Sequence, residues 1–502
     1  MEQTQRTHSL LLVTLFVMST MTALVSLTPS VMATNETTSG VIVGTETWQG
    51  AHSLTGDVEI APGAKLIIQP GTSITIPNGT YIHVKGNMCA GDTSCGAVGM
   101  GSNASRITFS WTSPANDSQT GRCYKMVNPS NGQPLWNPDA FCFEGILIRD
   151  TIYIAQTQLN HVTIQNAYGL ARYVADVGQI RFGALVLDGA SPTITELATQ
   201  NINTSSVLLL DLASPTFNGG TFTVGIEERE PTLLGNALQA YGAGSPTNPV
   251  TLNSPVFSGT QNGCSQSDNG RHVVWAQKSF VDIDHGVVAS ADYGYRYTDA
   301  AGTVTANTIT TDCTGIDING RRSVLANDYE LRLVSNTITT GDNSPVTAYE
   351  GAYTYIGNNF LSGAAEGSGI QVVSSYPEIA EVTISNNIIG PVTGYNGIWG
   401  VGYVDVHVDN NTFQNINREP VILGEYHFGD QGWQVTGPSP ARGTFVDNTI
   451  NNVSGSCDSS TIWDSQGFNC PAFHFFRSSA TVKRNNIIGV QGDGIRAIGA
   501  II

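Results

Sequence analysis

Aromatic and acidic side chains gather in two stretches near the end of the chain, residues 418–433 and 455–476. Flat rings can cover the apolar face of a sugar ring, while carboxylates bind its hydroxyl groups. The candidate residues for this chemistry, three rings and two carboxylates, are Tyr426, Trp433, Trp463, Glu425 and Asp430. Aromatic rings are also core material, so the alternative is that they pack both stretches against the body of the protein.

Further aromatic residues recur upstream of these two stretches. They can extend the same binding surface along the molecule, or they can stack on one another as ladders. These residues are Tyr349, Tyr353, Tyr355, Tyr395, Trp399 and Tyr403.

Eight cysteines occur in an order that suggests four local pairs. The pairs are Cys89 with Cys95, Cys123 with Cys142, Cys264 with Cys313, and Cys457 with Cys470. An oxidising compartment turns such cysteines into disulfides, whereas a reducing one leaves them as ligands or nucleophiles. Zinc binding is the alternative, but the chain has no C-x-x-C spacing. We therefore predict disulfides and no metal site.

The first 33 residues indicate export. Arg6 precedes an apolar run, Leu10 to Leu27, and Val31-Met32-Ala33 is a small-residue cleavage pattern. This layout is typical of a signal peptide at 1–33, here followed by a polar linker at 34–40. An uncleaved anchor is the alternative, because the apolar run is nearly long enough to span a bilayer. We predict no other membrane-inserted segment, and a secreted or cell-surface location.

A formal net charge of −18 disfavours nucleic acid and anionic membranes as partners. A polysaccharide or a cell-surface glycan is the partner we expect, and an acidic one would need calcium to bridge the like charges. Apart from calcium we predict no cofactor, because phosphate-binding loops, dinucleotide-binding turns, HExxH helices and nucleophile elbows are absent from the required strand contexts.

The elements that must position these residues are predicted by a short motif that recurs seven times after residue 304. Each copy has a polar pair ending in Asn, a spacer and an apolar residue. The copies are 23 to 38 residues apart, the length of one unit in a solenoid. Asn tolerates the left-handed conformation of a turn, and its amide can bond the equivalent Asn one unit away. The repeated residues are Asn307, Asn336, Asn359, Asn387, Asn411, Asn448 and Asn486.

The two longest spacings are the last two, so two adjacent units each carry an insertion. These insertions hold the aromatic and acidic residues described above. Adjacent insertions on adjacent units are expected to build one feature.

Upstream, strict alternation of apolar and polar residues from Asp57 to Thr72 is interrupted by the turns Pro62-Gly63 and Pro70-Gly71. This start and the Asn-bearing turns resemble the right-handed parallel β-helix proteins of the pectate-lyase-like superfamily, especially its exported repeat proteins. The resemblance implies an all-β fold, a right-handed parallel β-helix of three-stranded coils with loop insertions.

The predicted β-helix spans residues 41–502. It divides into N-terminal coils at 41–112, a loop insertion at 113–143, and further coils at 144–502. Because solenoids normally end in a polar cap and this chain ends in apolar residues, we expect the β-helix to be incomplete at Ile502.

Enzymes of the resembled group act in a groove on one face, and parts of their motifs occur here. Val281-Asp282-Ile283-Asp284-His285 resembles the W-I-D-H strand of pectate lyases without its Trp. Arg418-Glu419-Pro420 resembles the start of their R-x-P-x-x-R segment, whose first Arg abstracts a proton, but Leu423 replaces the second Arg. Asp312 to Asp317 resembles the D-G-I-D turn of polygalacturonases, whose other elements are missing. The resemblance therefore makes Arg418 a candidate catalytic residue beside Glu425 and Asp430.

Two functions follow from these observations. The first is a structural or adhesive role, in which loops on the β-helix recognise glycans or another surface. The alternative is a polysaccharide lyase or glycoside hydrolase acting in a groove near the two insertions. An enzyme needs converging Asp, Glu or Arg side chains, and an adhesin does not.

Overall fold

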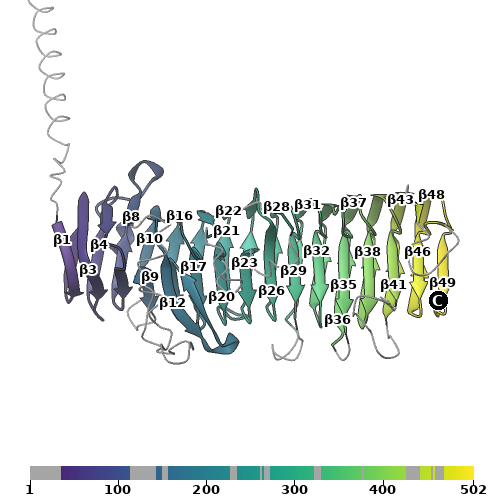
Figure 1. Cartoon of the computed structure of the whole chain (residues 1–502), viewed down its shortest axis with the longest axis horizontal. Helices are drawn as coiled ribbons and strands as arrows, with labels where there is room; N and C mark the ends of the chain where they lie inside the picture. Colours follow the sequence, from purple (N-terminus) through teal and green to yellow (C-terminus); the bar gives the residue numbers. More distant parts are fainter. Residues whose placement is uncertain are drawn as a thin grey trace, which may run out of the picture.

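The computed structural model is a right-handed parallel β-helix, which confirms the fold class (Figure 1). Strands from successive coils stack side by side in three parallel sheets along a rod. The structure describes residues 36–112, 143–149, 157–225, 235–259, 263–264, 272–320, 329–375, 378–424, 441–453, 456–457 and 468–502.

Each coil contributes one strand to each sheet, in the order first, second, third. The first sheet has 15 strands. They are β2 (Thr45–Trp48), β4 (Lys65–Ile68), β7 (Asn87–Ala90), β10 (Gln158–Asn160), β15 (Thr193–Thr195), β18 (Thr216–Asn218), β21 (Val250–Asn253), β24 (Val281–Asp284), β27 (Gly302–Thr305), β30 (Leu331–Val334), β33 (Tyr353–Gly357), β36 (Ala380–Ser385), β39 (Val404–Asp409), β42 (Arg442–Val446) and β47 (Ser479–Lys483).

The second and third sheets are joined through one long strand, β3 (Ala51–Ile60), whose two halves pair with different neighbours. The second sheet continues with β1 (Glu36–Ile42), β5 (Ser73–Ile76), β8 (Ile107–Trp111), β11 (Val162–Gln165), β16 (Ala198–Gln200), β19 (Thr221–Thr223), β22 (Val256–Ser258), β25 (Val287–Val288), β28 (Thr308–Thr311), β31 (Thr337–Thr340), β34 (Phe360–Gly363), β37 (Ile388–Val392), β40 (Thr412–Ile416), β43 (Thr449–Val453) and β48 (Asn486–Val490).

The third sheet continues from the second half of β3 along the whole rod. Its strands are β6 (Tyr81–Val84), β9 (Phe143–Arg149), β14 (Leu185–Asp188), β17 (Val207–Leu210), β20 (Leu238–Tyr241), β23 (His272–Gln277), β26 (Tyr293–Thr298), β29 (Ile316–Asn319), β32 (Val346–Tyr349), β35 (Ile370–Ser374), β38 (Ile398–Gly402), β41 (Val421–Gly424), β46 (Phe473–Phe476) and β49 (Ile495–Ile498).

The three sheets enclose one continuous apolar core that extends from Ile42 to Ala480. Alternation along each strand fills it: β28 and β31 share the sequence Thr-Ile-Thr-Thr and bury their isoleucines. Phe222, Phe257 and Tyr295 of successive coils pack against one another, the first pair tilted and the second edge to face, with ring centroids 5.5 and 5.8 Å apart. Each fully buried side chain of this size contributes about 1.5–3 kcal/mol, so the core is what holds the coils together.

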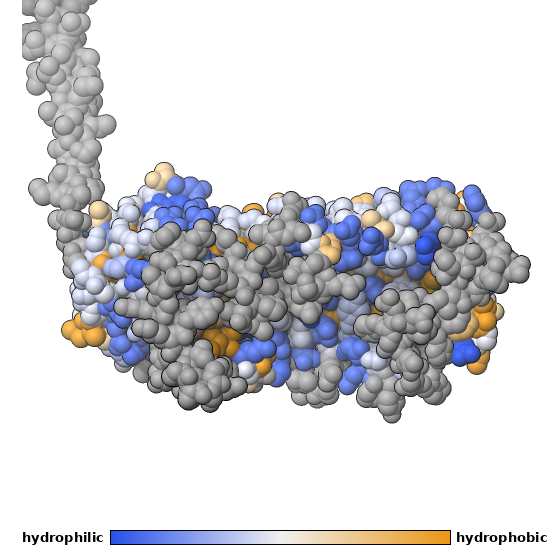
Figure 2. Space-filling model, viewed as in Figure 1, coloured by the Kyte–Doolittle hydropathy of each residue, from blue (hydrophilic) through white to orange (hydrophobic). Residues whose placement is uncertain are grey.

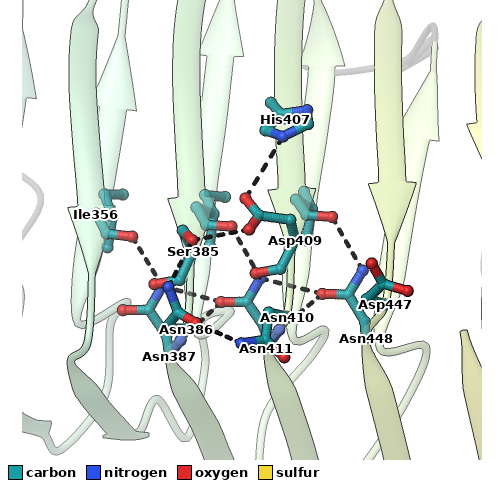
Figure 3. Close-up of polar contacts among 12 residues, drawn as sticks. Ile356, Ser385, Asn386, Asn387, His407, Asp409, Asn410, Asn411, Asp447 and Asn448 are labelled. Carbon is teal, nitrogen blue, oxygen red and sulfur yellow. Dashed lines mark hydrogen bonds and ion pairs between the residues drawn. The ribbon is translucent and has the colours of Figure 1, made fainter.

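Seven asparagines form the predicted ladder at the corner between the first and second sheets. From Asn336 onward each accepts, on its Oδ1, bonds from the backbone N–H and the Nδ2 of the Asn in the coil before it, as Asn411 does from Asn387 at 2.8 and 2.9 Å (Figure 3). The Oδ1 of Asn307, the first of the seven, accepts instead from the backbone N–H of Gly286. Each Nδ2 also bonds a backbone carbonyl of the preceding coil. The ladder residues are Asn307, Asn336, Asn359, Asn387, Asn411, Asn448 and Asn485.

Two details of the ladder differ from the prediction. In the last copy the ladder residue is Asn485, whereas Asn486 is exposed and begins β48. The left-handed residue is the one before each ladder Asn, for example Asn386 with φ of 59° and Asn410 with φ of 54°. The ladder Asn therefore acts through its amide alone, and its neighbour makes the turn.

Three segments depart from the predicted organisation. The linker prediction at 34–40 overlaps β1, because the residues from Glu36 onward pair with β3. Most of the predicted insertion at 113–143 lies outside the described residues, and Phe143 already belongs to β9. An antiparallel hairpin of β12 (Gly169–Val174) and β13 (Gln179–Gly183), which the sequence did not predict, interrupts the coils.

On the face shown in Figure 2, the described surface is largely hydrophilic, with apolar patches at the two ends and a further one between them. The exposed apolar residues at the C-terminal end are Ile487, Ile488, Ile495, Ile498, Ile501 and Ile502. A continuation beyond Ile502 stays a prediction.

Candidate functional site

Apart from residues 91–106, the longer connections between strands border the third sheet. Many of these connections contain residues outside the described ranges. In the connections that lead into a third-sheet strand, these residues are 113–142, 226–234, 260–262 with 265–271, and 454–455 with 458–467. Those that follow one are 150–156, 321–328, 376–377 and 425–440. From β10 onward, by contrast, the corner between the first and second sheets holds only short turns. Functional residues gather where loops join a rigid scaffold, so a site is expected on the third sheet.

From β9 to β49, each strand of the third sheet has one outward-facing residue that pairs with the equivalent residue of the next strand. We call these residues the outer row. Neighbouring members lie on strands about 4.8 Å apart. The outer row consists of Leu147, Val186, Leu208, Gln239, Trp275, Arg296, Asp317, Thr347, Gln371, Trp399, Ile422, His474 and Arg496. It is apolar at its start, and from Gln239 onward every member except Ile422 is aromatic or polar.

The hairpin of β12 and β13 covers the apolar start of the outer row (Figure 1). A second core cluster, outside the β-helix interior, joins the hairpin to the sheet. Its buried members are Leu147, Leu170, Val174, Val186, Leu208, Leu210 and Tyr241. Arg172 of the hairpin also pairs with Asp188 of β14. The outward residues are therefore apolar where a second layer covers them.

At the edge of the hairpin, two guanidinium groups flank the partly exposed ring of Trp275. Arg181 lies 5.4 Å and Arg296 5.3 Å from the ring centroid. Arg181 of β13 is buried, and its Nε donates a hydrogen bond of 2.7 Å to the hydroxyl of Tyr241. Cations over an aromatic face are attracted by the ring quadrupole, so these residues hold one another in a fixed arrangement.

Asp317 is the next member of the outer row and meets three side chains. Its Oδ2 lies 3.5 Å from Nε of Arg296 and 3.8 Å from Nε2 of His272. Its Oδ1 accepts a hydrogen bond of 3.0 Å from the hydroxyl of Thr347. Burial raises the pKa of Asp317, and the charge of Arg296 and the bond from Thr347 partly oppose that rise. Since 15% of this side chain and 17% of Arg296 remain exposed, the pair is largely desolvated but reachable.

His272 supplies a neutral imidazole beside this ion pair. Its side chain is only 4% exposed. Burial, and secondarily the charge of Arg296, lower the pKa of His272 well below its usual value, so the ring is uncharged at neutral pH. It packs on Tyr293 with centroids 5.0 Å apart, and its Nδ1 has no hydrogen-bond partner in the part of the chain that the structure describes. A neutral imidazole next to a carboxylate and a guanidinium is a combination able to move protons.

Of the residues predicted to do chemistry, only Arg418 lies in the described ranges. It precedes β41, and its guanidinium lies 4.7 Å from the ring centroid of Tyr395. This contact places Arg418 at the edge of the third sheet, beside the outer row. The other predicted residues lie outside the described residues, so their roles stay predictions: Glu425, Tyr426, Asp430, Trp433 and Trp463.

The two insertions that carry those residues attach at different corners of the coil. Residues 425–440 follow β41, whereas 454–455 and 458–467 precede β46. Because β41 and β46 are parallel neighbours, the attachment points lie at opposite ends of a strand pair. Their attachment points therefore lie on the two sides of the third sheet, and the expectation that the insertions build one feature stays a prediction.

A second acid and imidazole pair, which sequence reasoning missed, lies between those attachment points. His474 belongs to the outer row on β46, and its Nδ1 lies 3.5 Å from Oε1 of Glu419. Both residues are at least nine-tenths buried, at 9% and 5% exposure. Glu419 adjoins the predicted Arg418, so the partial motif there did mark a cluster of charged residues.

Of the other partial enzyme motifs, the polygalacturonase-like segment ends at Asp317 of the cluster, whereas the segment that resembles the W-I-D-H strand lies elsewhere on the coil. Asp282, Asp284 and His285 belong to or follow β24 of the first sheet, on a different face from the outer row. Asp284 and His285 are exposed and contact each other at 2.9 Å. This segment therefore does not contribute to the cluster at Asp317.

The structure confirms two predicted disulfides, Cys89–Cys95 and Cys264–Cys313. The second joins the segments that lead into β23 and β29, the strands that carry His272 and Asp317. Cys470 is also disulfide-bonded. The predicted pairing of Cys123 with Cys142 lies outside the described residues, as does the side chain of Cys457.

No group of three or more His, Cys, Asp or Glu side chains among the described residues is arranged to hold a metal ion. Calcium therefore stays a prediction. No helix in the described ranges is long and apolar enough to cross a membrane.

No protein-family model matches the chain, and no curated protein matches it. Among solved structures, the periplasmic alginate epimerase AlgG is 9% identical with a TM-score of 0.30, covering 91% of this chain and 78% of that chain. A mutant of that epimerase is 10% identical with a TM-score of 0.32, covering 71% and 76%. The polygalacturonase from Erwinia carotovora ssp. carotovora is 10% identical with a TM-score of 0.22, covering 93% and 98%. At such low similarity, we argue the function from the residues of this chain.

Proposed function

We propose that this chain is an exported glycan-binding protein whose binding surface is the outer face of the third sheet, from β23 to β46. The observation that carries the proposal is the outer row itself. Over these strands it presents two tryptophans and, between them, the polar residues Arg296, Asp317, Thr347 and Gln371, of which all but the buried Thr347 are partly exposed.

An extended row of this kind suits a linear polymer with a short repeat. Strands follow one another every 4.8 Å or so, a spacing close to the length of one extended sugar unit. Trp275 and Trp399 are partly exposed and offer flat apolar faces, while the side chains between them offer hydrogen bonds to hydroxyl groups. Sugar rings need both kinds of contact, which supports a glycan rather than a peptide or a lipid.

Binding is tested with a panel of neutral and uronate oligosaccharides, with and without calcium, by calorimetry on the exported protein. Trp399→Ala should weaken binding about three- to tenfold, because one stacked ring contributes roughly 0.5–1.5 kcal/mol beyond its buried area. The matched control is Tyr355→Ala, which removes a partly exposed ring from the first sheet. Equal losses for both variants, or no binding to any member of the panel, would count against the proposal.

A second candidate function is cleavage of a uronate polymer, and the cluster around Asp317 favours it. In a lyase reaction a base removes the proton next to the sugar carboxylate, and the glycosidic oxygen leaves with the electron pair and takes up a proton. The uncharged His272 can accept that proton, and Arg296 can neutralise the carboxylate. Absorbance of unsaturated products and the appearance of reducing ends detect turnover. His272→Gln should abolish it while binding persists.

Location outside the cell or on its surface is part of the proposal. Disulfides persist in oxidising compartments, and both Cys89–Cys95 and Cys264–Cys313 support such a location. Antibody detection on intact cells and in the medium, compared with lysed cells, measures it. Protein found only after lysis would oppose the proposal.

A further inference from the structure

The outer row has two unequal ends. At its N-terminal end the hairpin of β12 and β13 lies over Leu147, Val186 and Leu208. From Trp275 onward, the outward side chains Gln371 and Trp399 are partly exposed. A linear chain lying along the exposed part would therefore meet the hairpin directly beyond Trp275.

The hairpin is anchored at the place where that meeting would occur. Arg181 bonds the hydroxyl of Tyr241 and stacks on both Tyr241 and Trp275, each ring centroid 5.4 Å away. Leu170 and Val174 pack the same hairpin onto the sheet. Several buried apolar side chains and a charge-assisted bond hold it there, so it is a permanent wall rather than a lid.

The side of the wall that faces the outer row is chemically suited to a sugar. Trp275 supplies a flat ring, and the guanidinium groups of Arg181 and Arg296 flank it. Arg296 keeps 17% of its side chain exposed beside Asp317. A guanidinium and a carboxylate together can bond neighbouring hydroxyls, and a guanidinium can bond a carboxylate of a terminal uronate.

We propose that the hairpin makes this surface specific for the end of a glycan chain, with the terminal sugar held against Trp275 and the edge that carries Arg181. This inference rests on the proposed glycan-binding function and adds to it the part of the polymer that is recognised. An internal stretch of polymer cannot occupy the same position, because its continuation would clash with the hairpin.

The test uses an oligosaccharide that binds in the panel above, twelve sugars or so in length, and compares three forms by calorimetry. One form has free ends, one carries a bulky 2-aminobenzamide group at its reducing end, and one carries a bulky cap at its non-reducing end. We expect one cap to weaken binding at least about tenfold and the other to change it less than about twofold. We also expect one protein per chain, however long the chain is.

Tolerance of both caps, loss with both, or a stoichiometry that rises with chain length would overturn the inference while leaving glycan binding intact. Absence of binding by the uncapped form would instead overturn the glycan-binding function and the inference with it. The two failures are therefore distinguishable in one experiment.

Two variants link the discrimination to the hairpin. Arg181→Gln should reduce the difference between capped and uncapped chains to less than about threefold, because the stack on Trp275 is lost. The matched control, Arg332→Gln, removes an arginine stacked 4.4 Å from the ring of Tyr355 on the first sheet and should leave the difference unchanged. Trp275→Leu, which removes the aromatic ring beside Arg181 and should have the same effect, serves if Arg181→Gln does not fold. Full discrimination in the folded variant would overturn the assignment of the wall.

Discussion

Replacing the ladder residue Asn411 by Ala should destabilise the β-helix by roughly 3–5 kcal/mol. The Nδ2 of Asn411 donates to the carbonyls of Ile384 and Asp409 at 2.8 and 2.9 Å and to Asn448 Oδ1 at 3.1 Å. Its Oδ1 accepts two bonds from Asn387. A buried hydrogen bond contributes about 1 kcal/mol net, and a buried N–H left without a partner costs about 1–3 kcal/mol.

The matched control is the neighbouring position. Asn410 is exposed, has φ of 54° and makes a side-chain bond to Asn386. Glycine adopts this backbone conformation without strain, so Asn410→Gly should cost less than about 1 kcal/mol. The pair therefore compares a buried ladder amide with an exposed turn residue one position away.

Urea unfolding measures the global loss for the two variants. Because solenoid coils can open separately, native-state hydrogen exchange of the Asn387 amide adds a local measurement. In Asn411→Ala that amide should exchange faster by the factor that corresponds to the lost free energy. If Asn411→Ala falls within 1 kcal/mol of Asn410→Gly and the Asn387 amide stays protected, then the reasoning on the ladder is wrong.

Three further outcomes are expected. Burial lowers the pKa of His83 to about 4, so the neutral ring contributes fully to stability above pH 6.5, and stability falls by up to about 1.4 kcal/mol per pH unit between pH 6.5 and 4. His83→Gln should flatten this part of the plot of urea midpoint against pH. An unchanged slope in the variant would contradict the assignment. Asp317→Asn should lower stability in thermal melts by about 2–4 kcal/mol, since it leaves Arg296 without its carboxylate, and Asp405→Asn on the first sheet is the exposed control. Cys264→Ser, which opens a loop of 49 residues, should cost about 4 kcal/mol against about 2 kcal/mol for Cys89→Ser, with a loop of 6; equal losses on denaturation would refute the loop-entropy reasoning.

The fold was predictable from the sequence because the same short motif recurs in successive coils. An Asn at the same step of the last seven coils, with an apolar residue two positions later, indicates both the corner and the buried side of the next strand. The last copy shows the limit of this reading. Where two asparagines follow each other, Asn485 and Asn486, residue type alone does not show which one belongs to the ladder.

The cluster at Asp317 could not be found in the same way. The segment that ends at Asp317 was noticed as a turn-like match, but it lies on strand β29, and its partners His272 and Arg296 come from two earlier coils. Connections of unequal length separate these coils, so no fixed spacing links the three residues. The sequence signal for this cluster is the change from apolar to polar residues along the outer row. This change can be recognised only after the strands have been aligned by their hydrogen-bond register.

The hairpin of β12 and β13 was missed for a related reason. Its alternating residues read as ordinary strands, and alternation does not tell an antiparallel excursion from a parallel coil. Leu170 and Val174 pack on the outside of the β-helix, a burial that depends entirely on what the third sheet presents there.

Because the coils stack at a regular spacing, the number of coils between two sites on the rod sets the distance between them. Asp317 and His474 belong to the same outer row, and the strands β32, β35, β38 and β41 separate them. Removing one complete coil, from Asn336 to the residue before Asn359, would join the ladder and the core again and bring the two sites one strand spacing closer. The length measured along the surface can thus change in steps of about 4.8 Å by gain or loss of whole coils, while the chemistry at each end stays the same.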